Sequence, residues 1–188
     1  MRKVVVSEFV SVDGVMEDPG GAEGFEFGGW TMPYWNDEIA AFKTEELTAS
    51  DALLLGRVTY EGFAAAWPGR NDEAGFAEKM NTNRKYVVSS TLDKAEWQNS
   101  TVFGSNWADD LARAKQEDGR DILVFGSARL VQGLLTRGLV DELRLEVYPL
   151  VLGKGKRLFG DDSHTKLELV SQQATSTGVV LLVYRQAS

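Results

Sequence analysis

Hydrophobic and polar positions along the chain repeat in two periods, one typical of strands and one typical of helices. Short apolar runs such as Ile122–Phe125 predict buried strands, and the spacing of Tyr60, Phe63, Ala64 and Trp67 predicts a helix with one apolar face. The predicted strands cover residues 3–10, 52–55, 85–89, 101–103, 122–125, 143–147, 166–170 and 179–184. The predicted helices cover residues 37–48, 58–67, 73–82, 106–118 and the stretch between Ser127 and Gly138.

The order of these elements predicts an α/β fold. Strands and helices alternate over most of the chain, which is typical of strand–helix–strand units with parallel strands. Two strands joined by Ser176–Gly178 close the chain and predict an antiparallel edge. We therefore expect one domain over residues 1–188, built as three layers with a mainly parallel central sheet, an antiparallel C-terminal edge and helices on both faces.

Composition and charge exclude several classes of protein. The chain has no cysteine, which excludes disulfides, thiolate metal sites and a cysteine nucleophile, and its one histidine, His164, lies in a predicted polar turn. The formal net charge of −8 argues against binding to nucleic acid or to an anionic membrane surface. No signal peptide or membrane-spanning segment is recognisable. We expect a cytoplasmic protein without a metal site, a nucleic-acid partner or a membrane partner.

Three predicted strands end in turns whose residue types suit phosphate binding. Glycine permits a close backbone approach, arginine supplies several donors, hydroxyl groups reach anion oxygens, and a helix N-terminus attracts anions. Each turn alone is equally typical of an empty turn with a helix cap. Together they favour a ligand with several phosphates that lies across one sheet edge. The candidate residues are Gly56, Arg57, Thr59, Ser89, Ser90, Thr91, Gly126, Ser127, Ala128 and Arg129.

A long glycine-rich connection, residues 11–36, carries several aromatic side chains, among them Trp30 and Trp35. Loops of this length inside a compact domain are commonly functional or mobile. Its aromatic residues suit two roles equally well: they could contact a flat ring, or they could anchor the loop to the body of the domain.

Several segments, in this order, resemble a known family. LLLGRVTYEGF, KYVVSSTL and DILVFGSARLVQGLL are similar to the cofactor-binding segments of the dihydrofolate-reductase superfamily. Ser11–Gly14 and Pro149–Phe159 resemble one branch of it, the reductase domain of bacterial riboflavin biosynthesis and its stand-alone relatives. The resemblance covers about residues 2–185. It implies a dihydrofolate-reductase-like fold, NADPH as cofactor, a small heterocyclic substrate that is pterin-like or a ribosylaminopyrimidine, and a homodimer.

The resemblance also implies roles for the three turns. The segments Gly56–Thr59 and Ser89–Thr91 would hold the adenosine 2′-phosphate and pyrophosphate, and the helix after Gly126–Ser127 would point at the pyrophosphate. A cis peptide between Gly126 and Ser127 is part of the expectation. The physical chemistry agrees, because an arginine with hydroxyl groups suits a 2′-phosphate, whereas a ribose diol would require a carboxylate.

The proton donor is harder to assign. By resemblance it is a carboxylate on the helix after the long loop, where Glu38 fits the spacing best and Asp37 lies next to it; Asp13 and Glu146 are rivals. Asp37 and Glu38 are also explained as first-turn acids that complement the helix dipole. The candidate catalytic residues are therefore Glu38, Asp37 and Asp13, and the candidate substrate-binding residues are Trp30, Trp35 and Glu146.

The chain departs from riboflavin-pathway relatives in one respect, because it lacks the His-x-Glu and Cys-x-x-Cys of a zinc deaminase domain. At most, it corresponds to the reductase half of the riboflavin-pathway enzyme. The leading interpretation is an NADPH-dependent oxidoreductase. The alternatives are a module that binds NADPH, a pterin or a flavin without turnover, and a structural domain whose turns are empty.

Overall fold

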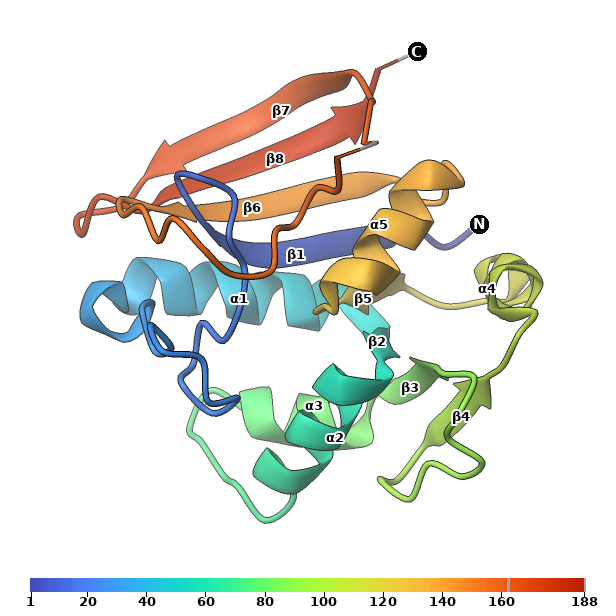
Figure 1. The fold of residues 1–188 in the computed structure, drawn as a ribbon. Helices are drawn as coiled ribbons and strands as arrows, with labels where there is room; N and C mark the ends of the chain where they lie inside the picture. The colour runs from blue at the N-terminus through green and yellow to red at the C-terminus, as the bar shows by residue number, and fades with distance from the viewer. Residues whose placement is uncertain (162, 188) are drawn as a thin grey trace.

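The computed structural model describes residues 1–161 and 163–187. Figure 1 shows a central sheet with helices around it. The strands are β1 (Val4–Ser11), β2 (Ser50–Gly56), β3 (Arg84–Val88), β4 (Ser100–Phe103), β5 (Asp121–Val124), β6 (Glu142–Tyr148), β7 (Leu167–Ala174) and β8 (Val180–Gln186). The helices are a 3-10 turn η1 (Met32–Tyr34) and α1 (Asp37–Ala49), α2 (Arg57–Ala66), α3 (Phe76–Thr82), α4 (Trp107–Gln116) and α5 (Ala128–Thr136).

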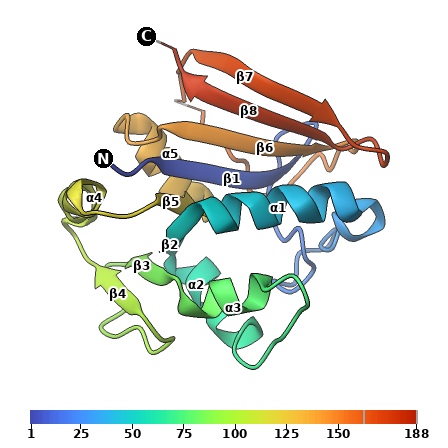
Figure 2. The same ribbon diagram turned by 180° about the vertical axis from the view of Figure 1, so that it is seen from behind.

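Within the described residues, one sheet has the strand order β4-β3-β2-β5-β1-β6-β8-β7. The strands from β4 to β6 run parallel, and β8 and β7 add an antiparallel edge. Alternate residues of β1 explain the layers: Val4 and Val6 face the core under α4 and α5, while Val5 faces the core under α1, α2 and α3. The two views from opposite sides show α5 in front of the sheet in one and α1 in front in the other (Figures 1 and 2). The predicted three-layer fold is confirmed.

The sheet opens beside the second half of β1. Pairing of β1 with β5 ends at Val6–Val124, whereas pairing of β1 with β6 continues to Ser11–Tyr148. Gly126 has a φ of +72°, a left-handed conformation that glycine adopts readily, and there the chain leaves β5 for α5. We call the region between residues 7–11 of β1 and residues 125–127, where the two segments no longer pair as strands, the sheet gap. The peptide between Gly126 and Ser127 is cis, as expected.

The long connection after β1 is tied down by two aspartates. The buried carboxylate of Asp18 accepts hydrogen bonds from the backbone N–H groups of Ala22, Glu23 and Phe25. Asp13 ties the start of the connection to the segment after β6. These contacts give the connection a defined path beyond the carboxyl end of β1.

Two element boundaries differ from the predicted ones by three residues or more. The helix expected over 73–82 begins only at Phe76, because Asp72 accepts from the N–H groups of Phe76 and Ala77 and fixes the start of α3. Strand β7 extends to Ala174 through polar residues, because its backbone pairs with β8 up to Val180 although its side chains are exposed. In the described part of the chain, no helix is long and apolar enough to cross a membrane.

Candidate functional site

The three predicted phosphate turns lie side by side at one edge of the sheet. β3, β2 and β5 are parallel neighbours, so their carboxyl ends meet. The N–H of Gly56 donates to the carbonyl of Gly126 over 3.2 Å, and Gly56 pairs with Val88, directly before Ser89. A Cβ added to Gly56 would lie 2.5 Å from Ser127 Oγ, so only glycine lets these turns approach so closely. The structure thus brings together the residues that the sequence predicts for the cofactor.

Two helices begin at this edge. No side chain among the described residues caps the start of α2 at Arg57 or of α5 at Ala128. The first-turn N–H groups of a helix have no partner within the helix, so both starts can bind an anion. The Arg57 guanidinium is 44% exposed and pairs with Glu61 at 3.0 Å, a surface pair weak enough to exchange for a phosphate.

The serine-rich turn after β3 combines both of its predicted roles. Ser89 is buried, and its Oγ accepts from the N–H groups of Thr91 at 3.1 Å and Leu92 at 2.9 Å, so it shapes the turn. Ser90 and Thr91 are exposed at the same edge. Arg129, in the first turn of α5, is exposed as well. Ser90, Thr91 and Arg129 are therefore the side chains of these turns that a ligand can reach.

A buried charge cluster lies between α1 and the sheet, on the α1 side of the gap. Lys43 Nζ lies 2.5 Å from Glu46 Oε1, 2.8 Å from Ser7 Oγ and 3.3 Å from Glu146 Oε1. We call Ser7, Lys43, Glu46 and Glu146 the Lys43 cluster. All four side chains are buried, and the Lys43 ammonium also lies over the rings of Phe9 and Phe125, which border the gap.

The cluster and its neighbour Glu8 contain more carboxyl groups than cations. Burial raises the pKa of Glu146, and Lys43 offsets only part of this. Burial would lower the pKa of Lys43, but the carboxylates of Glu146 and Glu46 outweigh burial and raise it. Burial raises the pKa of Glu8 to about 8, against the opposing effects of the Gly126 N–H and Lys43. With its pKa raised to about 8, Glu8 favours the protonated acid at neutral pH.

The two carboxylates in the first turn of α1, Glu38 and Asp37, lie where a structural role explains them. Glu38 Oε2 accepts from Ser176 N at 2.7 Å, from Ser176 Oγ at 2.6 Å and from Asn36 Nδ2 at 2.9 Å, which ties α1 to the turn between β7 and β8. These hydrogen bonds, those from Ser176 first, lower the pKa of Glu38, so it is ionised at neutral pH and holds no proton to donate. Asp37 is exposed in the first helical turn. The geometry favours the structural interpretation for both residues.

Asp13 is also held as a carboxylate. It accepts from Ser11 Oγ at 2.7 Å, Gly153 N at 2.8 Å and Leu152 N at 3.1 Å. The bond from Ser11, followed by the two backbone N–H groups, lowers the pKa of Asp13 to about 2. The contacts make Asp13 a tie between two loops rather than a donor of protons.

Replacing Asp13 with asparagine is expected to lower the free energy of unfolding by about 1.5–3 kcal/mol, because hydrogen bonds to a charged acceptor are lost. The pKa of Asp13 falls from 3.8 to about 2 on folding, so the wild-type advantage holds at higher pH and disappears as the pH falls through that window. Urea unfolding at several pH values measures this. The exposed Asp93→Asn change is the control; an equal loss in both variants would contradict the role of Asp13.

The three predicted substrate residues lie in three different environments. Trp30 is buried, donates from Nε1 to the Glu17 carbonyl at 2.8 Å and lies edge-on to Tyr148, so for Trp30 the anchoring role holds. Trp35 is 46% exposed and lies edge-on to Phe9 at the gap, so it is accessible to a ligand. Glu146, a fully buried member of the Lys43 cluster, faces α1 from β6.

Comparison with known proteins places this geometry in a family. The family model of the RibD C-terminal domain matches residues 2–181. The chain belongs to the RibD C-terminal domain family. The uncharacterized protein YyaP of Bacillus subtilis (strain 168) is 30% identical over 188 residues, covering 97% of this chain and 94% of that protein.

Solved structures share the fold of this RibD C-terminal domain. A putative riboflavin biosynthesis protein from Shewanella sp. PV-4 matches with a TM-score of 0.72 at 18% identity, over 100% of both chains. Dihydrofolate reductase from Enterococcus faecalis, complexed with NADP(H), matches with a TM-score of 0.63 at 17% identity, over 99% of this chain and 97% of that one. The predicted family resemblance is confirmed, and at these identities the structural likeness shows the fold alone.

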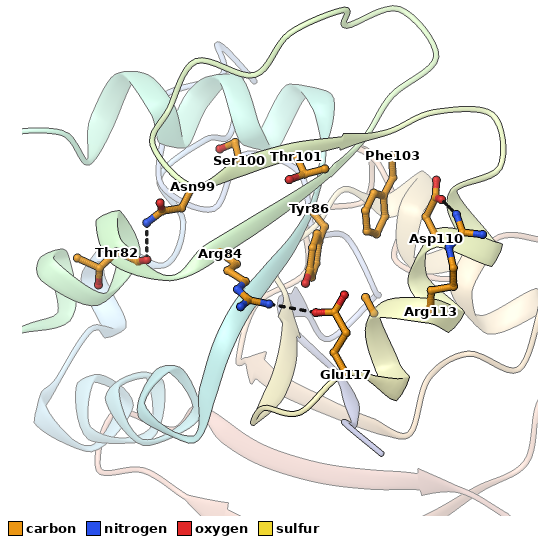
Figure 3. Close-up of a pocket in the computed structure, with 11 residues that line it drawn as sticks. Thr82, Arg84, Tyr86, Asn99, Ser100, Thr101, Phe103, Asp110, Arg113 and Glu117 are labelled. Carbon is orange, nitrogen blue, oxygen red and sulfur yellow. Dashed lines mark hydrogen bonds and ion pairs between the residues drawn. The ribbon is translucent and has the colours of Figure 1, made fainter.

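The RibD C-terminal domain also has an open groove of about 740 Å³ away from these turns, between β3, β4 and α4. Figure 3 shows Arg84 directed at Glu117, at 3.0 Å, and the ring of Tyr86 beside that of Phe103, stacked at 4.7 Å. Its charged side chains are paired with each other, and none of the three turns lines it. We therefore place the candidate site at the sheet edge and gap.

The sequence interpretation missed Glu8, Ser7, Lys43 and Glu46. One signal was available, because Lys43 and Glu46 lie on the same helical face as Ile39 and Leu47, where apolar residues are expected. Polar residues on the buried face of a helix indicate partners in the core.

Proposed function

We propose that this RibD C-terminal domain protein is an NADPH-dependent reductase that transfers hydride to a flat heterocyclic substrate, pterin-like or of the ribosylaminopyrimidine type. The observation that supports the proposal is the convergence of three turns beside the sheet gap, with Gly56 and Gly126 in direct hydrogen-bond contact. A side chain at the glycine positions would crowd these turns, since a Cβ on Gly126 would lie 3.1 Å from Thr59 Oγ1. The predicted homodimer and cytoplasmic location stay predictions.

The residues present fit such a cofactor. Arg57, Ser90 and Thr91 supply the charged and hydroxyl donors that a 2′-phosphate needs, and the starts of α2 and α5 supply N–H groups for the pyrophosphate. When bound, NADPH supplies the hydride. The chain's own contribution is to position the reacting rings and provide a proton, since hydride transfer needs little covalent chemistry from the protein.

The substrate side of the gap is aromatic. Phe9 and Phe125 border it, and the exposed Trp35 lies against Phe9, with ring centroids 6.2 Å apart. Flat aromatic side chains favour a flat ring as ligand. This arrangement supports a heterocyclic substrate and does not distinguish a pterin from a pyrimidine.

Replacing Arg57 with alanine is expected to weaken NADPH binding by about 1.5–3 kcal/mol, roughly 10- to 150-fold, because charged hydrogen bonds to the 2′-phosphate are lost. NADH, which lacks that phosphate, should bind almost equally well to both proteins. Quenching of tryptophan fluorescence measures both affinities. Arg70→Ala removes another exposed arginine as the control. An equal loss for NADH and NADPH would refute the assignment of Arg57.

The second candidate function is binding without turnover. It is favoured by the state of Glu38, since the carboxylate expected to donate a proton is ionised and occupied by Ser176. Oxidation of NADPH, followed by its absorbance with dihydrofolate, dihydropterin and ribosylaminopyrimidine as trial substrates, separates the two. Cofactor binding without oxidation by any of them would favour the binding module.

A further inference from the structure

One buried carboxyl lies in the sheet gap itself. Val4, Val6 and Val10 occupy the α5-side face of β1, and Glu8 takes the one polar position in that series. Glu8 is 7% exposed, and its Oε1 accepts from the N–H of Gly126 at 2.5 Å. Glu8 therefore bridges the two sides of the gap at the point where β1 and β5 separate.

The gap is the next position along the proposed cofactor edge. The order of the elements there is β3, β2, β5 and then the gap beside β1, with neighbouring strands about 4.8 Å apart. A dinucleotide whose phosphates lie at the turns after β3, β2 and β5 has its nicotinamide end at the gap. Glu8, which accepts from Gly126 across the gap, would lie next to it there.

Charged and polar groups act on Glu8 from both faces of β1. The turn after β5 donates the Gly126 N–H to it, while the charges of Lys43 and Glu46 on α1 and of Glu146 on β6 act from the opposite face. Burial and the two carboxylates favour the protonated acid, whereas Lys43 and the N–H favour the carboxylate. From α2, Thr59 approaches the same turn. A new positive charge in the gap would shift this balance toward the carboxylate.

We propose that Glu8 changes its protonation with the oxidation state of the nicotinamide: it is a carboxylic acid beside the neutral dihydronicotinamide and a carboxylate beside the cationic oxidised ring. This rests on the proposed function. The acid form matches the ring's carboxamide, because its O–H can donate to the amide oxygen while its carbonyl accepts from the amide N–H. The carboxylate form neutralises the cation in a buried site, where charge pairing is strong.

The step balances in atoms and charge. When bound, NADPH would supply a hydride, which is one hydrogen with both electrons of its C4–H bond, to the carbon of a substrate C=N bond. The Glu8 O–H bond breaks, and its proton passes to the substrate nitrogen. The substrate would be reduced and the nicotinamide oxidised, and the Glu8 carboxylate would offset the new positive charge. Water restores the proton after the products leave.

Proton release on binding tests this without a known substrate. Calorimetric titrations at neutral pH in phosphate and in Tris, which differ in ionisation enthalpy, count the protons released. The wild-type protein should release close to one proton with NADP⁺ and none with NADPH or with 2′-phospho-ADP-ribose, which lacks the nicotinamide. Glu8→Gln should bind NADP⁺ with no release, whereas Glu45→Gln, which removes an exposed acid on α1, should behave as wild type.

The outcomes separate the two proposals. If none of the three ligands binds, the proposed function fails and the role of Glu8 falls with it. Binding of all three with equal proton release would overturn the role of Glu8 alone, as would release that persists in Glu8→Gln or disappears in Glu45→Gln. The comparison of the three ligands uses the wild-type protein, so it decides the matter even where a variant does not fold.

Discussion

Replacing Lys43 with methionine is expected to lower the free energy of unfolding by about 3–5 kcal/mol, because it leaves buried carboxylates without their cation. The Lys43 ammonium lies 2.5 Å from Glu46 Oε1 and 3.3 Å from Glu146 Oε1, and both carboxylates are almost fully buried. Methionine fills a similar volume, so the loss reports the charge rather than a cavity. Urea unfolding at neutral pH measures it.

The pH dependence of the Lys43→Met variant identifies the cause. Carboxyl groups with raised folded pKa values bind more protons in the folded state than in the unfolded state, so the stability they contribute is lost as pH rises through the folded value. The pKa of Glu146 is raised even with Lys43 present and should rise further without it. The loss of unfolding free energy in the variant should therefore become smaller in acid.

The control is Lys3→Met, which removes the pair between the exposed Lys3 and Glu142 at 3.7 Å. It should lower the free energy of unfolding by less than about 1 kcal/mol. Equal losses in the two variants would contradict the buried-cluster interpretation.

Replacing Gly56 with alanine is expected to weaken NADPH binding by roughly tenfold or more and to lower the free energy of unfolding by about 1–3 kcal/mol, the usual cost of overpacking. The added Cβ would lie 2.5 Å from Ser127 Oγ and 3.2 Å from Ser127 N, which forces the turns after β2 and β5 apart. The φ of Gly56 is −71°, so the effect does not come from backbone preference. Fluorescence titration and urea unfolding measure the two losses.

Two further variants test this explanation. Adding Ser127→Gly to Gly56→Ala removes the atoms nearest to the new Cβ and should recover part of both losses. Gly62→Ala lies within α2 with nothing within 4 Å of its added Cβ, and it should leave NADPH binding unchanged while it stabilises the helix by about 0.5–1 kcal/mol. A loss of binding in Gly62→Ala, or no recovery with Ser127→Gly, would contradict the proposed close approach.

Most of the fold could be predicted from local patterns. The run Ile122–Phe125 followed by Gly126 gave β5 and its end, since a short apolar run between turn residues fits a strand covered on both faces. The helix after it was recognisable from apolar residues on one face, and α5 covers Ala128–Thr136. The second half of β7 could not be found this way, because backbone pairing with β8 holds it rather than a pattern of buried side chains.

The polar interior was much less predictable. Glu8 accepts from Gly126, which is 118 residues away, and Lys43 meets Glu146, which is 103 residues away. Glu38 fits the spacing of a proton donor in the sequence, yet its contact with Ser176, 138 residues away, gives it a structural environment. A carboxyl group's protonation depends on burial and on such distant partners, and neither is a property of local sequence.

The sequence by itself determined the three-layer α/β fold and the presence of three glycine or hydroxyl turns at strand ends. Apolar periodicity and turn residues act over a few neighbouring positions, so they are readable along the chain. Only the tertiary structure decided which turns touch, where β1 and β5 separate, and that Glu8 and the Lys43 cluster lie at that gap. These features depend on the order of the strands in the sheet and on the low dielectric of the interior. Water does not solvate buried charged groups there, so they are stable only when groups from distant segments pair with them.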